Sequence, residues 1–246
     1  MIDTHAHLDA CADRPSAIIR RAREAGVERI ISIGVGLESS RETLAIAQRE
    51  EGVFAALGIP PHNADEEGNL REIGDLLLEE DVVAVGEAGL DYFRDYAPRE
   101  TQLRLFEKQL GLAAEFGKPI VVHSRAANAD TLDVLAAFEG TVVLHCFSEP
   151  HLLPAALERG YYVSFAGNIT FPSARDLRVA ASQVPADRLL VETDSPYLAP
   201  QPRRGRPNEP AHVVHTVATL AETRREDVGE LVARIDANAT AAFSLP

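Results

Sequence analysis

The chain has 246 residues, with 24 Lys and Arg against 38 Asp and Glu, so its formal net charge is -14. A shell this acidic repels polyanions, which excludes a protein that coats nucleic acid without specificity. A cleft that gathers divalent cations and a few arginines is still able to be locally positive.

We predict a single soluble domain over residues 1–246, because α/β barrels of this length fold as one unit. The two cysteines, Cys11 and Cys146, are too few for a disulfide framework. The first predicted strand begins at Ile2 without a basic leader, and no run approaches the roughly 18 apolar residues of a membrane span. The sequence therefore favours a cytoplasmic protein without membrane attachment, and it shows no sign of an obligate protein partner.

Short aliphatic runs alternate with amphipathic stretches along the chain, which is the rhythm of parallel strands joined by helices. We expect a TIM-like (β/α)8 barrel, in which all the strands point their C-terminal ends at one mouth. A doubly wound open sheet is the alternative, and it would concentrate its site at one switch point. The expected strands are 2–8, 29–35, 53–59, 82–87, 119–123, 142–147, 161–165 and 189–194.

After the last expected strand, a loop rich in Pro and Arg covers residues 196–210, and two helical stretches complete the chain. Thr223 and Glu226 have the spacing of a capping box ahead of an apolar periodic stretch that begins at Val228. We therefore expect the final C-terminal helix to begin at Thr223.

Six residues with metal-binding side chains stand at the ends of expected strands. In a barrel these ends converge, which predicts a binuclear centre of two divalent ions that supports hydrolysis. Imidazoles two residues apart on a strand, as in His5-x-His7, point to the same face. The nitrogen-rich donor set suits Zn, Mn, Co or Fe better than an all-oxygen Mg site does. The six candidate ligands are His5, His7, Glu87, His123, His145 and Asp194.

Two of these residues are predicted to be catalytic. Many two-metal barrels bridge their ions with a carbamylated lysine on the fourth strand. Neither lysine of this chain can take that place, because Lys108 lies in a helix and Lys118 precedes the fifth strand at the opposite end of the barrel, so Glu87 is the expected bridge. Asp194 is expected to hold one ion and to accept the proton of the attacking water. Glu192, one layer deeper on the same face, is expected to orient a ligand through a hydrogen bond.

Three residues are predicted to bind the substrate. Arg125 follows the fifth expected strand on the face that points to the mouth, and its planar guanidinium suits phosphate. Arg204 stands with two other arginines in the proline-stiffened loop after the last strand. His62, just beyond the third expected strand, is the third predicted contact.

With these residues in place, the chain resembles the TatD family of metal-dependent deoxyribonucleases from Met1 to about Phe243. Several independent motifs occur in family order and at matching spacing. They are DTHAHL at 3–8, GEAGLDY at 86–92, HSR at 123–125, HCFS at 145–148, ETDSPYL at 192–198, RGR at 204–206 and NEP at 208–210.

The resemblance implies a TIM-like barrel and a DNase that depends on Mg²⁺ or Mn²⁺, commonly a 3′ to 5′ exonuclease on single-stranded DNA. The resemblance favours Mg²⁺ or Mn²⁺, and the nitrogen-rich ligands favour an ion such as Zn²⁺, so the expected metal is one of these three. The resemblance also implies that one ion is held by His5, His7, Glu87 and Asp194, and a second by Glu87, His123 and His145.

Three positions depart from the family pattern. Pro60 replaces a histidine that often precedes His62, Glu149 stands where a glycine is common, and Pro172 stands where a lysine is common. Together they remove one cation and add one anion near the expected mouth, which would weaken the binding of a long DNA strand.

Two other functions are compatible with the same residues. A metal centre of this kind also activates water against a carbonyl, so an ester or amide hydrolase, such as a D-aminoacyl-tRNA deacylase or a small-molecule hydrolase, is the alternative. The absence of Trp leaves few platforms for stacking unpaired bases and favours this alternative. A metal-bearing interaction protein is least favoured, because burying these ligands without a metal would leave charged and polar groups without partners.

Overall fold

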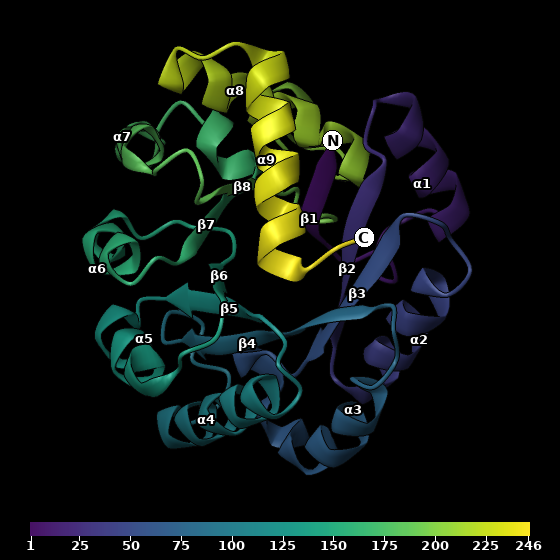
Figure 1. The fold of residues 1–246 in the computed structure, drawn as a ribbon, viewed down its shortest axis with the longest axis vertical. Coiled ribbons are helices and arrows are strands. Elements are labelled where there is room, and N and C mark those ends of the chain that lie inside the picture. Colours follow the sequence, from purple (N-terminus) through teal and green to yellow (C-terminus); the bar gives the residue numbers. More distant parts are fainter.

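The computed structural model describes residues 1–246 and contains one sheet of eight parallel strands, paired in sequence order. This arrangement confirms the expected barrel, and the alternative of a doubly wound open sheet is wrong (Figure 1). The strands are β1 (Ile2–Ala6), β2 (Arg29–Val35), β3 (Val53–Gly58), β4 (Val82–Asp91), β5 (Ile120–Arg125), β6 (Val142–Leu144), β7 (Tyr162–Phe165) and β8 (Leu189–Val191).

The helices around the barrel each turn an apolar face inward, toward the strands. In α1 (Pro15–Glu24), for example, Pro15 occupies the first turn, Ile18 and Ile19 are buried, and Arg20 and Arg23 are exposed. No helix combines the length and the apolar character needed to span a membrane. The α-helices are α1 (Pro15–Glu24), α2 (Leu37–Ala47), α3 (Leu70–Leu76), α4 (Arg99–Glu115), α5 (Asn128–Val134), α6 (Leu153–Glu158), α7 (Arg175–Gln183), α8 (Val213–Arg224) and α9 (Val228–Phe243).

Polar contacts between β1 and the residues after β8 close the barrel. Ala6 pairs with Ser195 in a parallel bridge. The carboxylate of Asp3 accepts hydrogen bonds from the backbone N–H of Thr193 at 2.9 Å and from its hydroxyl at 2.6 Å. Burial raises the pKa of Asp3 to about 8, although the hydrogen bonds from Thr193 oppose this shift. The first and last strands are therefore joined at the level where the strands end.

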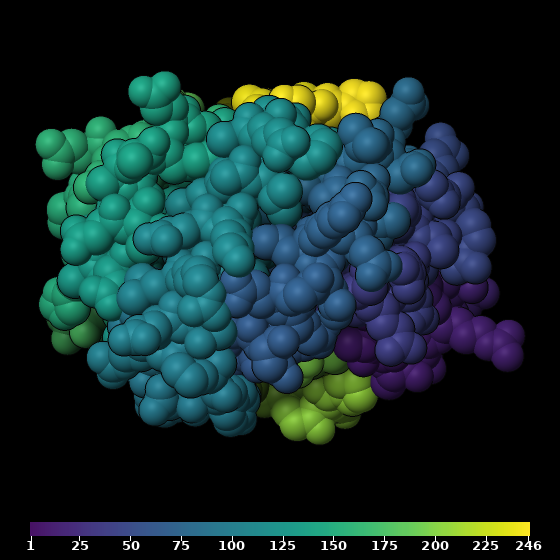
Figure 2. All heavy atoms as spheres, turned by 90° about the horizontal axis from the view of Figure 1, so that it is seen from below, coloured from purple at the N-terminus to yellow at the C-terminus, as the bar shows by residue number.

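Helix α9 covers the N-terminal end of the barrel. The side-chain amide of Asn238 donates to the carbonyl oxygens of Ala186 at 2.8 Å and Leu189 at 2.9 Å. A guanidinium nitrogen of Arg29, at the start of β2, donates to the hydroxyl of Thr240 at 2.9 Å. In the side view of Figure 2, α9 (yellow) lies along the upper edge and the segment after β8 (yellow-green) along the lower edge. The C-terminal strand ends are thus left to form the site.

The start of α9 differs from the prediction. Thr223 belongs to α8, and Arg225, the residue that follows this helix, is left-handed with a φ of 56°. Asp227 caps α9, and its carboxylate accepts the backbone N–H of Gly229 at 2.8 Å. The predicted capping box is wrong because α9 begins at Val228, immediately after Asp227, whose carboxylate caps its first turn.

Strand β4 continues to Asp91, beyond the predicted end at Glu87, because two glycines let it approach β5 closely. Gly86 and Gly89 have φ angles of 135° and 131°. A Cβ added to Gly89 would lie 2.1 Å from the carbonyl oxygen of His123. A side chain at this position would push apart the two strands that carry Glu87 and His123.

We expect Gly89→Ala to lower the free energy of unfolding by about 2–4 kcal/mol, since it adds backbone strain to an overpacked contact. Urea unfolding measures this change. Gly111→Ala is the matched control, because Gly111 lies in α4 with no heavy atom within 4 Å of the added Cβ. The control should be neutral or slightly stabilising. Equal unfolding midpoints for Gly89→Ala and wild type would contradict the expectation.

Candidate metal centre

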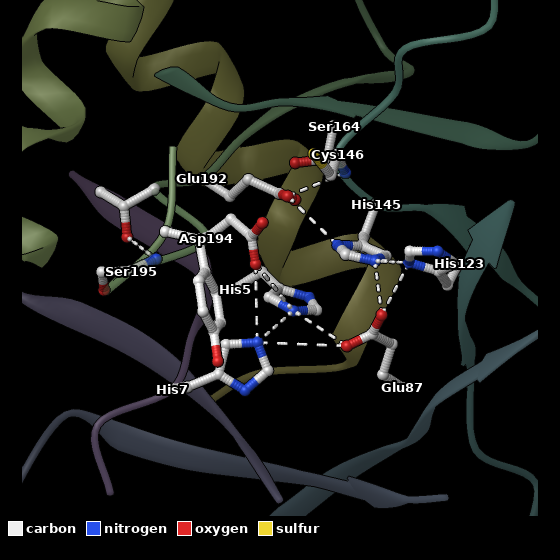
Figure 3. A network of polar contacts seen from close by, with 12 residues as sticks. His5, His7, Glu87, His123, His145, Cys146, Ser164, Glu192, Asp194 and Ser195 are labelled. Atoms are coloured by element: carbon white, nitrogen blue, oxygen red, sulfur yellow. Dashed lines mark hydrogen bonds and ion pairs between the residues drawn. The ribbon is translucent and has the colours of Figure 1, made fainter. Parts of the chain in front are cut away.

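The six predicted ligands converge at the mouth of the barrel (Figure 3). Strands β1, β6 and β8 end earlier than predicted, so three of the ligands lie just after a strand rather than within it. Backbone bonds hold these segments in place; for example, the N–H of Asp194 donates to the carbonyl of His5 at 2.9 Å. The ligands within strands are His5 in β1, Glu87 in β4 and His123 in β5, whereas His7, His145 and Asp194 follow β1, β6 and β8.

The carboxylate of Glu87 lies between two pairs of histidines. Its Oε1 is 2.8 Å from Nδ1 of His123 and 3.1 Å from Nε2 of His145. Its Oε2 is 3.8 Å from Nε2 of His5 and 4.0 Å from Nε2 of His7. Each oxygen therefore faces one pair, which is the arrangement that a bridging carboxylate requires.

Asp194 completes the group around the first pair of histidines. Its Oδ1 lies 3.7 Å from Nε2 of His5 and 3.5 Å from Nε2 of His7. The residue has a φ of 54°, a conformation that is uncommon for any residue other than glycine. Local strain of this kind persists where surrounding contacts hold it, and it concentrates at functional sites.

The distances between donor atoms fit shared cations. Nε2 of His5 lies 3.3 Å from Nε2 of His7, and Nδ1 of His123 lies 3.3 Å from Nε2 of His145. Two nitrogens that each bind a tetrahedral ion at about 2.1 Å are roughly 3.4 Å apart. The rings of His5 and His145 also stack, with centroids 4.0 Å apart. Facing nitrogen lone pairs in a buried site are stabilised by a cation between them, so the residues fit the predicted metal site.

Burial and the charges of neighbouring groups lower the pKa values of His5 and Glu87 and raise the pKa of His145. Burial lowers the pKa of His5 well below its usual value, and the charges of His145 and His7 add to this effect. Burial opposes the ionisation of Glu87, yet the charge of His145 and a hydrogen bond from His123 hold its pKa well below the usual range. Burial also opposes the protonation of His145, but the charge of Glu87 raises its pKa well above the usual value. A cation that binds between Glu87 and His145 would therefore displace a proton.

Glu192 contacts His145 from below, as the sequence predicts. Its Oε1 lies 3.3 Å from Nδ1 of His145 and accepts the backbone N–H of Cys146 at 2.8 Å. A carboxylate on Nδ1 of the imidazole leaves Nε2 directed at Glu87.

Asp91 is a further buried carboxylate at this site, and the sequence analysis gave it no role. Its Oδ2 lies 2.9 Å from Nε2 of His62 and 3.1 Å from Nε2 of His123. Burial opposes its ionisation, but hydrogen bonds from His123, the Arg94 backbone and His62 hold its pKa below the usual range. The sequence signal that could have identified Asp91 is the alternation of side chains along a strand, since positions 87, 89 and 91 face the same side.

The contact with Asp91 orients His123. A proton on Nε2 that is donated to Asp91 leaves Nδ1 free to face Glu87. His62, Asp91 and His123 are close enough to hold a third cation. His123 would then have to bind metals through both ring nitrogens, whereas two N–H donors to one carboxylate already account for the cluster.

We expect Asp91→Asn to weaken metal binding at the second site by about 10–100-fold, because a neutral amide holds the His123 tautomer less firmly. Titration of Mn²⁺ or Zn²⁺ against a competing chelator measures the affinity. Asp75→Asn, on the exposed face of α3, is the control and should bind metal like the wild type. An unchanged second affinity in Asp91→Asn would show that Asp91 does not position the ligand.

A cavity of about 520 Å³ opens above the six residues. Of the three predicted substrate contacts, His62 and Arg125 line this cavity. Arg204 lies outside it, with its guanidinium carbon 4.4 Å from the ring centroid of Phe171. The start of the loop after β8 borders the cavity with Tyr197 and Leu198, but its later part, which carries Arg204, lies beside the segment after β7.

The same cavity has aromatic residues in its wall that the sequence analysis missed. Tyr96 and Tyr197 both line it, together with Arg94. They follow β4 and β8, and their side chains are 66% and 57% exposed. The expectation of few stacking platforms is therefore wrong at the mouth, although the chain contains no Trp.

The three departures from the family pattern have different surroundings. Pro60 lines the cavity, whereas Glu149 and Pro172 do not. The carboxylate of Glu149 accepts the backbone N–H of Ala126 at 2.8 Å and the amide of Asn128 at 3.0 Å. Its negative charge is thus engaged in holding the segment after β5 and is not directed into the cavity.

Comparisons with known proteins agree with this geometry. The family model described as "TatD related DNase" matches residues 2–244. The "Uncharacterized metal-dependent hydrolase TatD" of Mycobacterium tuberculosis is 38% identical, with 100% of this chain and 98% of that protein covered. The "3'-5' ssDNA/RNA exonuclease TatD" of Cronobacter sakazakii is 37% identical over 92% of this chain and 90% of its own length. The crystal structure of YJJV, a TatD homolog from Escherichia coli, superposes with a TM-score of 0.91 at 31% identity, covering 100% of this chain and 98% of that one.

Proposed function

Because the chain belongs to the TatD-related DNase family, we propose that it is a metal-dependent hydrolase that removes nucleotides from the 3′ end of single-stranded DNA. The observation that carries the proposal is the Glu87 carboxylate, whose two oxygens each face a pair of histidines. This is the ligand arrangement of a binuclear centre. The nuclease names of related proteins support phosphodiesters as the substrate class.

We assign roles to the residues on this basis. Ions bound there, Mg²⁺, Mn²⁺ or Zn²⁺, would lower the pKa of a water towards neutrality and offset the charge of a phosphodiester. Asp194 would accept the proton of that water, and Arg125, which lines the cavity, would contact the non-bridging phosphate oxygens. His5, His7, Glu87 and Asp194 would hold one ion, and Glu87, His123 and His145 would hold the other.

The proposal involves no second protein, because all the residues to which it gives roles belong to this chain. We also propose that the protein acts in the cytoplasm. Both cysteines are unpaired, which fits a reducing compartment.

Digestion of single-stranded DNA tests the proposal. Chelator-stripped protein is given Mg²⁺, Mn²⁺ or Zn²⁺ and incubated with a 5′-labelled strand, and a Glu87→Ala variant is run in parallel. We expect mononucleotides and a ladder that shortens from the 3′ end, both dependent on metal and absent in the variant. A phosphorothioate at the 3′-terminal linkage should stop the ladder.

Failure of the fully metallated protein to release any nucleotide would refute the nuclease proposal. Hydrolysis of a carboxylic ester by the same preparation would then move the assignment to an acyl hydrolase, since a metal centre also activates water against carbonyls.

A further inference from the structure

We propose that one wall of the mouth cavity is a stacking subsite for the unpaired bases of a single-stranded nucleic acid. This wall is the segment between β4 and α4, residues 92–98, together with Arg125. Tyr96 provides an aromatic face, and Arg125, supported by Phe93, provides a flat guanidinium. The inference rests on the proposed function and names the part of the substrate that this wall recognises.

The exposed aromatic residues of the molecule gather at the mouth. Phe93 and Tyr96 are 68% and 66% exposed, and Tyr197 is the third strongly exposed ring. All three follow strands at their C-terminal ends, and the other strongly exposed hydrophobic side chains are aliphatic. A ring that is left in water beside a polar cavity marks a contact surface, because covering it with a partner is favourable.

Contacts at both ends hold the segment in place. The carboxylate of Asp91, which also contacts His123, accepts the backbone N–H of Phe93 at 3.0 Å. At the other end, the side-chain amide of Gln102 donates to the carbonyl of Ala97 at 2.8 Å. Tyr96 is therefore carried on a turn that is tied to the metal site, so a base stacked on it has a defined position relative to the scissile phosphate.

The charge and shape of the wall suit a nucleic acid strand. The guanidinium carbon of Arg125 lies 4.0 Å from the ring centroid of Phe93, which leaves one face of the guanidinium for a base. A guanidinium nitrogen of Arg94 lies 3.4 Å from the hydroxyl of Tyr96. Neither arginine is paired with a carboxylate, and both line the cavity, so they offer positive charge to phosphates in an otherwise acidic protein.

Tyr96 also contacts a residue beside the metal centre. Tyr96 and His62 are arranged edge to face, with ring centroids 5.8 Å apart. The stacking wall thus continues directly into the cluster of His62, Asp91 and His123 beside the metal centre. A strand whose scissile phosphate lies at the metal centre brings its neighbouring base to this wall.

Stacking on this wall requires unpaired bases. In a duplex each base face is covered by its neighbours, whereas a single strand can turn a base onto a protein ring. Every base has a flat face, so the subsite should tolerate all four bases. The wall therefore selects single strands without selecting a sequence.

Binding of an uncleavable strand by the metal-loaded protein tests the subsite. The probes are a fluorescent oligothymidylate of about ten nucleotides with phosphorothioate linkages, and the same strand with abasic residues at its 3′ end. Fluorescence anisotropy gives the Kd of each. We expect the wild type to bind the strand with bases roughly tenfold more tightly than the abasic strand.

The variants locate this preference. Tyr96→Ser should lose most of this preference, with Arg125 and Phe93 keeping the remainder, and Tyr96→Phe should retain the preference because it keeps the ring. Leu78→Ser, which removes an exposed hydrophobic side chain remote from the mouth, should behave as the wild type. A full preference in Tyr96→Ser, or none in the wild type, would overturn the proposal.

The binding test is independent of hydrolysis. If the wild type shows the base preference, loses most of it in Tyr96→Ser and yet degrades no unmodified DNA, the subsite stands and the nuclease proposal fails. If the protein degrades DNA but shows no base preference, the nuclease proposal stands and the subsite is refuted.

Discussion

Asp194→Asn is expected to lower kcat for DNA hydrolysis by about 10²–10⁴-fold while the protein stays folded. The neutral amide cannot accept a proton from water, and its oxygen is a weaker ligand than the carboxylate now 3.5–3.7 Å from His7 and His5. The fold should survive, because the tie between this segment and β1 is a backbone bond from Asp194 to the carbonyl of His5. Single-turnover rates on a labelled strand at saturating metal measure the effect.

The control for this substitution is Asp133→Asn, on the exposed face of α5, which should keep the wild-type rate. Urea unfolding midpoints of both variants should match the wild type within error. A wild-type rate in Asp194→Asn would remove Asp194 from the chemistry and leave the proton to another acceptor.

Glu87→Gln is expected to abolish one of the two metal sites and to reduce kcat/KM by about 10³-fold or more. An amide has one ligand oxygen, and its NH₂ group would face one of the two histidine pairs without binding a metal. Removal of the negative charge also removes the main reason for the raised pKa of His145, so the charge balance of the site changes. Metal analysis after gel filtration should find at most one ion per chain, compared with up to two in the wild type.

Two further variants sharpen this result. Glu107→Gln, on the exposed face of α4, should bind metal and hydrolyse DNA as the wild type does. Glu87→Asp keeps both oxygens and the charge but shortens the side chain, so it should retain more metal than Glu87→Gln. Two tightly bound ions in Glu87→Gln would show that Glu87 does not bridge them.

The barrel could be predicted from the sequence because its signals are local. Each strand is a short aliphatic run that is covered on both faces, and β2 has the predicted bounds of Arg29–Val35. The position at which a strand ends depends less on the local sequence. β6 stops at Leu144, three residues before the predicted end at Phe147, because its pairing with β7 covers only two positions, which depends on chain that is distant in sequence.

The ligands could be predicted because a barrel gathers whatever stands at the ends of its strands. A candidate on a long loop has no such constraint, and Arg204 lies over Phe171, outside the cavity. Asp91 escaped prediction because β4 continues past Glu87, and that continuation depends on how closely Gly89 approaches the carbonyl of His123.

The sequence by itself determined the barrel, the order of its strands and the six candidate metal ligands, since periodicity and position at strand ends suffice for these. Only the tertiary structure decided which oxygen of Glu87 faces which histidines, that Asp91 holds His123, and that Tyr96 borders the mouth. These features depend on side-chain directions and on contacts between segments far apart in the chain. Such contacts arise from packing, and local patterns in the sequence do not predict them.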